Sequence, residues 1–199
     1  MNAMHAVFLV VSAVPALPGT VNGEPARDPV YVAMHNDGLA HPDVARRAQA
    51  EVTRLYALID VAIVWVDAGR QDVGVRVLKL TTWEPSDDRL PVMALGVTYS
   101  TDGRRPTRGY VFWMRVQRYA QQFTVGVDML LGAAMAHELG HMLLPSGSHT
   151  NRGLMQATWD RNQFRSVSAG LLHFSPQSAA QIRRGVTTML ADNRGARGR

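Results

Sequence analysis

The sequence contains no cysteine and a single lysine, Lys79. Without cysteine the chain can form neither a disulfide nor a thiolate metal site, so histidine, aspartate or glutamate must hold any metal. Arginine supplies nearly all of the positive charge, and the net charge at pH 7 is +5. Because these arginines are scattered and no known binding motif occurs, we expect no nucleic-acid partner.

A long apolar run is also missing, since no segment reaches the roughly 20 residues that a membrane-spanning helix needs. The best candidate, AVFLVVSAVPAL at residues 6–17, lies in an uncharged N-terminal stretch and is interrupted by proline. Its length and small residues indicate a secretory signal peptide, with a buried first strand as the alternative. We therefore expect residues 1–23 to be a signal peptide and linker, and the protein to be extracytoplasmic or secreted; without such a signal it would be cytoplasmic.

The remaining chain is typical of one globular domain, with 46% hydrophobic residues in a total of 199. Apolar residues that alternate predict strands, and those spaced three or four apart predict helices. The predicted strands are residues 30–36, 61–68, 75–82, 92–100 and 110–116, and the predicted helices are residues 41–59, 125–144 and 174–190. This order of elements predicts an α+β domain over residues 29–191, followed by a basic flexible tail at residues 192–199.

One stretch, AHELGHMLLPSGSHTNRGLM at residues 136–155, holds three of the seven histidines and one of the four glutamates. Residues four apart lie on one face of a helix, so His137 and His141 can bind the same metal ion. Glu138 lies between them in sequence and can accept a proton from an activated water. This is the HExxH pattern of zinc hydrolases. The alternative is a helix end that carries two solvated histidines.

A third ligand can be sought by elimination, because no glutamate follows Glu138. The downstream candidates are His149, Asp160, His173 and Asp192. His149 is nearest and follows a Pro/Gly turn, and three neutral imidazoles would leave one coordination position open for catalysis. We favour His149 and keep Asp160 as an alternative ligand, although Asp160 could instead cap the turn after Trp159. His173 is expected to be a core residue with its polar groups satisfied.

These motifs resemble the metzincin zinc metallopeptidases, particularly the matrix-metalloproteinase type, in which HELGH is followed by a third histidine and a Leu-Met turn. The segments HELGHMLL, SHTNRGLM and FSPQSAA, together with Trp159, are also similar to uncharacterised bacterial domains predicted to be zinc proteases, over most of residues 30–190. The resemblance implies a single zincin-like domain, in which a small twisted mixed sheet packs on helices and an active-site helix carries HExxH.

The resemblance also implies roles for individual residues. The implied zinc ligands are His137, His141 and His149. Glu138 would be the general base, and Met155 the methionine of a turn that supports the metal site, although a methionine near a turn is often core filler. An edge strand would bind an extended peptide substrate near Leu95, Gly96 and Val97.

The chain departs from the metzincin pattern before the third histidine, where Leu144 replaces a glycine and the spacer is two residues longer. The expected function is zinc-dependent hydrolysis of peptide bonds, with a peptide or protein as the partner. One alternative is a non-catalytic zinc-binding or interaction module of the same fold. Another is a zinc hydrolase of a non-peptide amide or ester. No oligomeric state is predicted.

Overall fold

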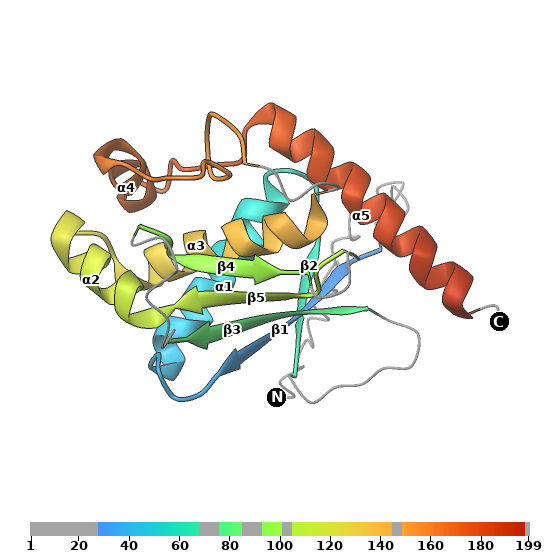
Figure 1. Cartoon of the computed structure of the whole chain (residues 1–199), viewed down its shortest axis with the longest axis horizontal. Coiled ribbons are helices and arrows are strands. Elements are labelled where there is room, and N and C mark those ends of the chain that lie inside the picture. The colour runs from blue at the N-terminus through green and yellow to red at the C-terminus, as the bar shows by residue number, and fades with distance from the viewer. Residues whose placement is uncertain (1–27, 68–75, 85–92, 101–104, 145–148, 198–199) are drawn as a thin grey trace, which may run out of the picture.

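A five-stranded, mostly parallel sheet forms the base of the domain (Figure 1). The computed structural model describes residues 28–67, 76–84, 93–100, 105–144 and 149–197. The strands are β1 (Val30–Asn36), β2 (Ile63–Val66), β3 (Val77–Trp83), β4 (Gly96–Tyr99) and β5 (Arg108–Phe112), in the spatial order β2-β1-β3-β5-β4. Only β4 is antiparallel to its neighbour. It lies at the edge of the sheet, as the family resemblance implies for the strand near Leu95, Gly96 and Val97.

Five helices are present in the described residues, and α3 is the central one. They are α1 (Pro42–Ala57), α2 (Trp113–Phe123), α3 (Val127–Leu143), α4 (Arg161–Ser168) and α5 (Pro176–Arg197). In Figure 1, α1 and α3 lie against one face of the sheet, and α2, α4 and α5 surround α3. The predicted mixed α+β domain is therefore confirmed.

The sequence of α3 explains its central position. It is apolar around its whole circumference, which is the pattern of a fully buried helix. Four residues interrupt this pattern, namely Asp128, His137, Glu138 and His141. Asp128 lies in the first turn, where a carboxylate stabilises the helix dipole. His141 lies in the last turn, where a basic residue also suits the helix dipole, but no such local reason places His137 and Glu138 on a core helix, so their presence points to a site.

Several predicted boundaries are wrong. The strand predicted for residues 110–116 ends at Phe112, and α2 begins at Trp113 because Trp113, Val116 and Ala120 bury one helical face. The short helix α4 was not predicted. The last helix continues to Arg197 instead of ending near residue 190, so most of the predicted flexible tail is helical.

The predicted signal peptide at residues 1–23 lies outside the described residues. None of the helices in the described part of the chain combines the length and apolar character needed to cross a membrane.

Candidate metal centre

The two histidines of the HExxH motif project from the last turns of α3 and face each other. Their Nε2 atoms are 3.0 Å apart, and their ring centroids are 4.7 Å apart. This follows from their spacing of four residues on a regular helix. Both side chains are partly exposed although most of α3 is buried. The predicted pairing of His137 with His141 is thus present in the structure.

His149 completes a cluster of three imidazoles. Its ring centroid lies 4.7 Å from that of His141 and 5.3 Å from that of His137. Each histidine offers one ring nitrogen to the cluster, and these three nitrogens lie within 4.8 Å of one another. Among the described residues, no other group of histidine, aspartate and glutamate side chains is arranged to hold a metal ion.

A main-chain carbonyl determines which nitrogen of His137 faces the cluster. Its Nδ1 lies 2.7 Å from the carbonyl oxygen of Leu154, which can only accept, so Nδ1 carries the proton. The Nε2 lone pair is then directed toward His141. Burial, and secondly the neighbouring His141, lowers the pKa of His137 from 6.5 to about 3. Burial also lowers the pKa of the His149 imidazole. Both rings therefore favour the neutral form that binds metals.

The donor set fits a metal ion. In a tetrahedral zinc site with Zn–N bonds of about 2.0–2.1 Å, neighbouring ligand nitrogens are about 3.3 Å apart. The separation of 3.0 Å between the Nε2 atoms of His137 and His141 is close to this value. The hydrogen bond from His137 to the Leu154 carbonyl is also the kind of contact that orients histidine ligands. The cluster could accordingly hold a metal ion.

Met155 lies beneath the histidine-bearing helix and is completely buried. A Cβ added at Gly140 would lie 2.5 Å from the Met155 sulfur, so glycine permits this contact. The main-chain N–H of Thr150 donates to the Met155 carbonyl at 2.8 Å, which closes the loop that begins at His149. Met155 is therefore packed into the structure that carries the third histidine.

The carboxylate of Glu138 is buried between α3 and the β4 edge of the sheet, with the residue only 4% exposed. Thr98 of β4 donates its hydroxyl to Glu138 Oε2 at 2.7 Å. Burial raises the pKa of Glu138 from 4.5 to about 8, and the Thr98 hydrogen bond partly opposes this rise. The residue is next to His137 in sequence, and both side chains line the same cavity.

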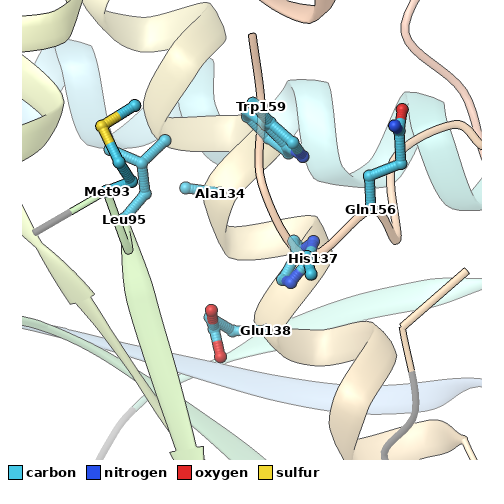
Figure 2. A pocket seen from close by; sticks show the side chains of 8 residues that line it. Met93, Leu95, Ala134, His137, Glu138, Gln156 and Trp159 are labelled. Carbon is cyan, nitrogen blue, oxygen red and sulfur yellow. The ribbon is translucent and has the colours of Figure 1, made fainter. Parts of the chain in front are cut away.

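That cavity opens beside the histidine cluster and is small, with a volume of about 40 Å³. Figure 2 shows Met93 and Leu95 beside β4, with Trp159 facing them across the cavity. His137 and Glu138 lie below these three residues in the same view. The full lining is Met93, Leu95, Ala134, His137, Glu138, Gln156, Ala157 and Trp159. Most of these side chains are apolar, so the cavity suits an apolar group bound next to the cluster.

The predicted substrate strand is present at the sheet edge with one difference. Leu95 precedes β4, and its carbonyl accepts a hydrogen bond from Phe112 N at 2.8 Å. Because an antiparallel ladder alternates, the main-chain groups of Leu95 and Val97 point toward β5, and those of Gly96 and Thr98 point toward the open side. The groups placed to pair with a further strand therefore belong to Gly96 and Thr98.

The other candidate ligands are engaged elsewhere. Asp160 caps α4, accepting from Asn162 N at 2.6 Å, in a capping box with Gln163. His173 is partly buried, and its Nε2 contacts the Gly170 carbonyl at 3.1 Å. Asp160 and His173 lie outside the histidine cluster, as does Asp192.

Sequence reasoning missed two contributors to the site, Thr98 and the Leu154 carbonyl. The alternation within the segment GVTYS was a usable signal for Thr98, because it places Gly96 and Thr98 on one face of the strand. No signal in the sequence indicates the Leu154 contact, which depends on the path of an irregular loop.

Comparisons with known proteins add no family assignment. A scan against protein-family models finds no match, and a search of the curated proteins finds no significantly similar sequence. The functional proposal consequently rests on the residues of the site.

Proposed function

We propose that the protein is a zinc-dependent metallopeptidase with a zincin-like fold, related in its site to the metzincins. The observation that carries this proposal is the placement of a buried carboxylate, Glu138, beside a cluster of three imidazoles and on the same cavity as His137. A purely structural metal site has no need for such a carboxylate. Catalytic zinc sites typically have three protein ligands and one open position.

The zinc ligands would be His137, His141 and His149. Imidazole suits zinc and several other transition metals, and a cluster without carboxylate ligands is a poor site for calcium or magnesium. When bound, zinc would supply Lewis acidity, which makes water a stronger acid and polarises a carbonyl group. Met155 would support the ligands from below without contacting the substrate.

Glu138 would act as the general base. Its carboxylate would accept a proton from the attacking water and deliver it to the leaving amine when the peptide bond breaks. Without a nearby cation, burial outweighs the opposing Thr98 hydrogen bond and raises the pKa of Glu138 to about 8, which favours the protonated form. A cation held by the adjacent histidines would favour the ionised form, because an opposite charge within a few ångströms lowers a carboxyl pKa.

The substrate would be an extended peptide that pairs with β4. Gly96 and Thr98 would offer their main-chain groups to it, since edge strands bind peptides by extending the sheet. An apolar side chain of the substrate would enter the cavity lined by Leu95 and Trp159. Gln156 provides a polar group at the same cavity for a main-chain or side-chain contact.

One observation favours the alternative of a non-catalytic zinc-binding module. The raised pKa of Glu138 and its hydrogen bond with Thr98 would also suit a permanently buried, protonated side chain. A peptidase would hydrolyse peptides and would need Glu138 to do so, whereas the non-catalytic module would bind zinc without hydrolysing peptides. A zinc hydrolase of a non-peptide amide or ester would share the need for Glu138 and would differ only in substrate.

The first test concerns the metal. Purified protein is expected to contain one zinc per chain by elemental analysis. We expect His149→Ala to lose most of this zinc and His173→Ala to retain it, because His173 lies outside the cluster. The reverse result would overturn the ligand assignment.

The second test concerns catalysis. Zinc-loaded protein is assayed on a peptide library beside Glu138→Gln. Glu84→Gln is the matched control, because Glu84 follows β3, accepts a hydrogen bond from Met114 N of α2 and does not line the cavity. Removal of a general base is expected to lower the rate by about 100-fold or more. Hydrolysis that is absent, or is equal in Glu138→Gln and wild type, would contradict the peptidase proposal.

A further inference from the structure

Three residues on the helix-facing side of β4 and β5 surround Glu138. Gly96 and Thr98 alternate along β4, and Gly109 is the direct partner of Thr98 on β5. We refer to Gly96, Thr98 and Gly109 as the Glu138 cradle. Each of them lies close to the Glu138 side chain.

Thr98 is the polar member of the cradle. Its hydroxyl is 2.7 Å from Glu138 Oε2 and 3.2 Å from the Glu138 carbonyl oxygen. A hydroxyl has one proton, and the shorter contact to the carboxylate is the stronger hydrogen bond. The side chain of threonine is stiff because it branches at Cβ, so the strand holds this donor in a fixed direction.

The two glycines provide the space that the carboxylate occupies. A Cβ at Gly96 would lie 2.7 Å from Glu138 Oε1 and 2.5 Å from the Tyr110 carbonyl oxygen. A Cβ at Gly109 would lie 3.1 Å from the Cβ of Glu138. One carboxylate oxygen, Oε2, therefore accepts a hydrogen bond from Thr98. The other, Oε1, lies against Gly96, which has no side chain.

We propose that Thr98 is a positioning residue for Glu138, an inference that rests on the proposed function. By holding Oε2, the hydroxyl fixes the rotation of the carboxylate, so that Oε1, which lies against Gly96, would be the oxygen that accepts the proton of the attacking water. The main-chain groups of Thr98 point toward the open edge where the substrate would pair. One residue thus links the bound peptide to the base.

The competing explanation is that Thr98 only attaches α3 to the sheet. Such a role would affect stability and would leave the turnover of folded, zinc-loaded protein unchanged. Thr98→Val removes the hydroxyl and preserves the shape, whereas Thr98→Ser preserves the hydroxyl and removes a methyl group. Comparison of the two variants separates hydrogen bonding from packing.

The kinetic test measures kcat and KM of zinc-loaded wild type, Thr98→Val and Thr98→Ser. We expect Thr98→Val to lower kcat by about 10- to 100-fold with KM changed less than about threefold, as for a group that acts in the chemical step. Thr98→Ser is expected to recover kcat to within about threefold. Unchanged kcat in Thr98→Val, or equal loss in both variants, would overturn the proposal.

A second readout does not require activity. The chain has four glutamates, so labelling glutamate with ¹³C at the carboxyl carbon gives four signals, and Glu138→Gln identifies that of Glu138. Thr98→Val is expected to shift the Glu138 signal alone, in metal-free and zinc-loaded protein, and Thr98→Ser to leave it in place. An unmoved signal in Thr98→Val would overturn the inference. A shifted signal in a protein without Glu138-dependent hydrolysis would support the cradle and refute the peptidase.

Discussion

His137 donates a hydrogen bond from Nδ1 to the main-chain carbonyl oxygen of Leu154, at 2.7 Å. This contact joins the histidine-bearing face of α3 to the loop that carries His149. The Leu154 N–H in turn donates to the His173 carbonyl at 2.8 Å, so the loop is held from both sides. One tautomer of His137 is favoured as a result, with Nε2 available for a metal.

This tautomer can be observed directly. In ¹⁵N-labelled metal-free protein near pH 6, His137 is expected to be neutral with its proton on Nδ1, since its pKa is about 3. Zinc should then shift the Nε2 signal and leave Nδ1 protonated. Long-range ¹H–¹⁵N correlation spectra of the imidazoles provide the measurement, and His173 serves as an internal control. A His137 ring protonated on Nε2 would contradict this geometry.

Gly140 and Met155 are expected to be energetically coupled. Alanine at Gly140 gains about 1 kcal/mol of helix propensity but would overlap the Met155 sulfur, and overpacking of a core typically costs about 1–3 kcal/mol. Gly140→Ala should therefore lower the free energy of unfolding in wild type by up to about 2 kcal/mol. In the Met155→Ala background the overlap is removed, and the same change should be neutral or stabilising.

Urea denaturation of the wild type, both single variants and the double variant gives the coupling. After the Met155 atoms, the nearest atom to a Cβ at Gly140 is Cε1 of Phe174 at 3.6 Å, which is ordinary van der Waals separation. A destabilisation by Gly140→Ala that is equal in both backgrounds would show that Met155 does not pack on α3 as described.

The part of the site that sequence alone predicts is the part determined by local geometry. The spacing of His137 and His141 places them together on any regular helix, and elimination among few acidic residues favours His149. The strand predicted for residues 92–100 is present as β4, which is shorter and spans Gly96–Tyr99. The position of this strand at the edge of the sheet is implied only by the family resemblance.

The remaining features depend on contacts distant in sequence. Thr98 and Glu138 are 40 residues apart, and only the strand order β2-β1-β3-β5-β4 brings them together. The predicted strand continues past Phe112, where β5 ends, because aromatic and β-branched residues, which favour strands, lie on both sides of this position. By contrast, α4 had a readable start signal, since Asp160 and Gln163 are spaced as a capping box.

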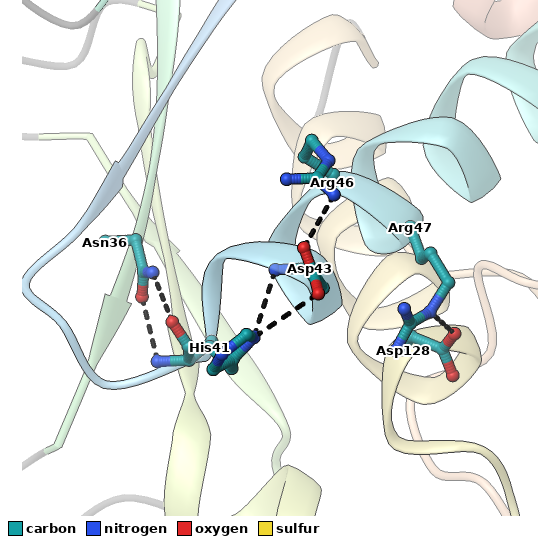
Figure 3. A network of polar contacts seen from close by, with 7 residues as sticks. Asn36, His41, Asp43, Arg46, Arg47 and Asp128 are labelled. Atoms are coloured by element: carbon teal, nitrogen blue, oxygen red, sulfur yellow. Dashed lines mark hydrogen bonds and ion pairs between the residues drawn. The ribbon is translucent and has the colours of Figure 1, made fainter.

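An ion pair between α1 and α3 should make stability depend on pH. Arg47 Nε lies 2.6 Å from Asp128 Oδ2 (Figure 3). Burial raises the pKa of Asp128, but the hydrogen bond from Arg47 and main-chain N–H groups outweigh it, and the net pKa is lowered from 3.8. The stabilisation is therefore fully present above pH 3.8 and is lost as the pH falls through the lower folded value.

Asp128→Asn is accordingly expected to lower the free energy of unfolding by about 0.5–1 kcal/mol at pH 7, the range for partly exposed ion pairs and helix-dipole contacts. The difference from wild type should shrink toward zero below the folded pKa of Asp128. Urea denaturation of both proteins at a series of pH values measures it. Asp43→Asn is the control, because Asp43 pairs with Arg46 within α1 and does not link two helices. A gap that is independent of pH would contradict the ion-pair explanation.

A row of hydroxyls connects the start of α5 to the residue after His149. Ser178 is completely buried, with its Oγ 2.9 Å from Ser175 Oγ and 3.3 Å from Thr150 Oγ1. Thr150 donates its own proton to the Arg152 carbonyl, so Ser178 must donate to Thr150 and accept from Ser175. Loss of the Ser178 hydroxyl would remove one hydrogen bond from each of two partly buried hydroxyls, which would keep only the Thr150 bond to the Arg152 carbonyl and the Ser175 bond from the Ser178 N–H.

Ser178→Ala is therefore expected to lower the free energy of unfolding by about 1–3 kcal/mol. It should also weaken zinc binding by about 3- to 10-fold, less than the roughly 10- to 100-fold typical of groups bonded directly to a ligand. Competition with a chromogenic chelator measures the zinc affinity. Thr187→Ala is the matched control, since its exposed hydroxyl bonds to the Arg183 carbonyl within the same helix. Equal zinc affinity in both variants would show that α5 stabilises the fold without holding the third histidine in place.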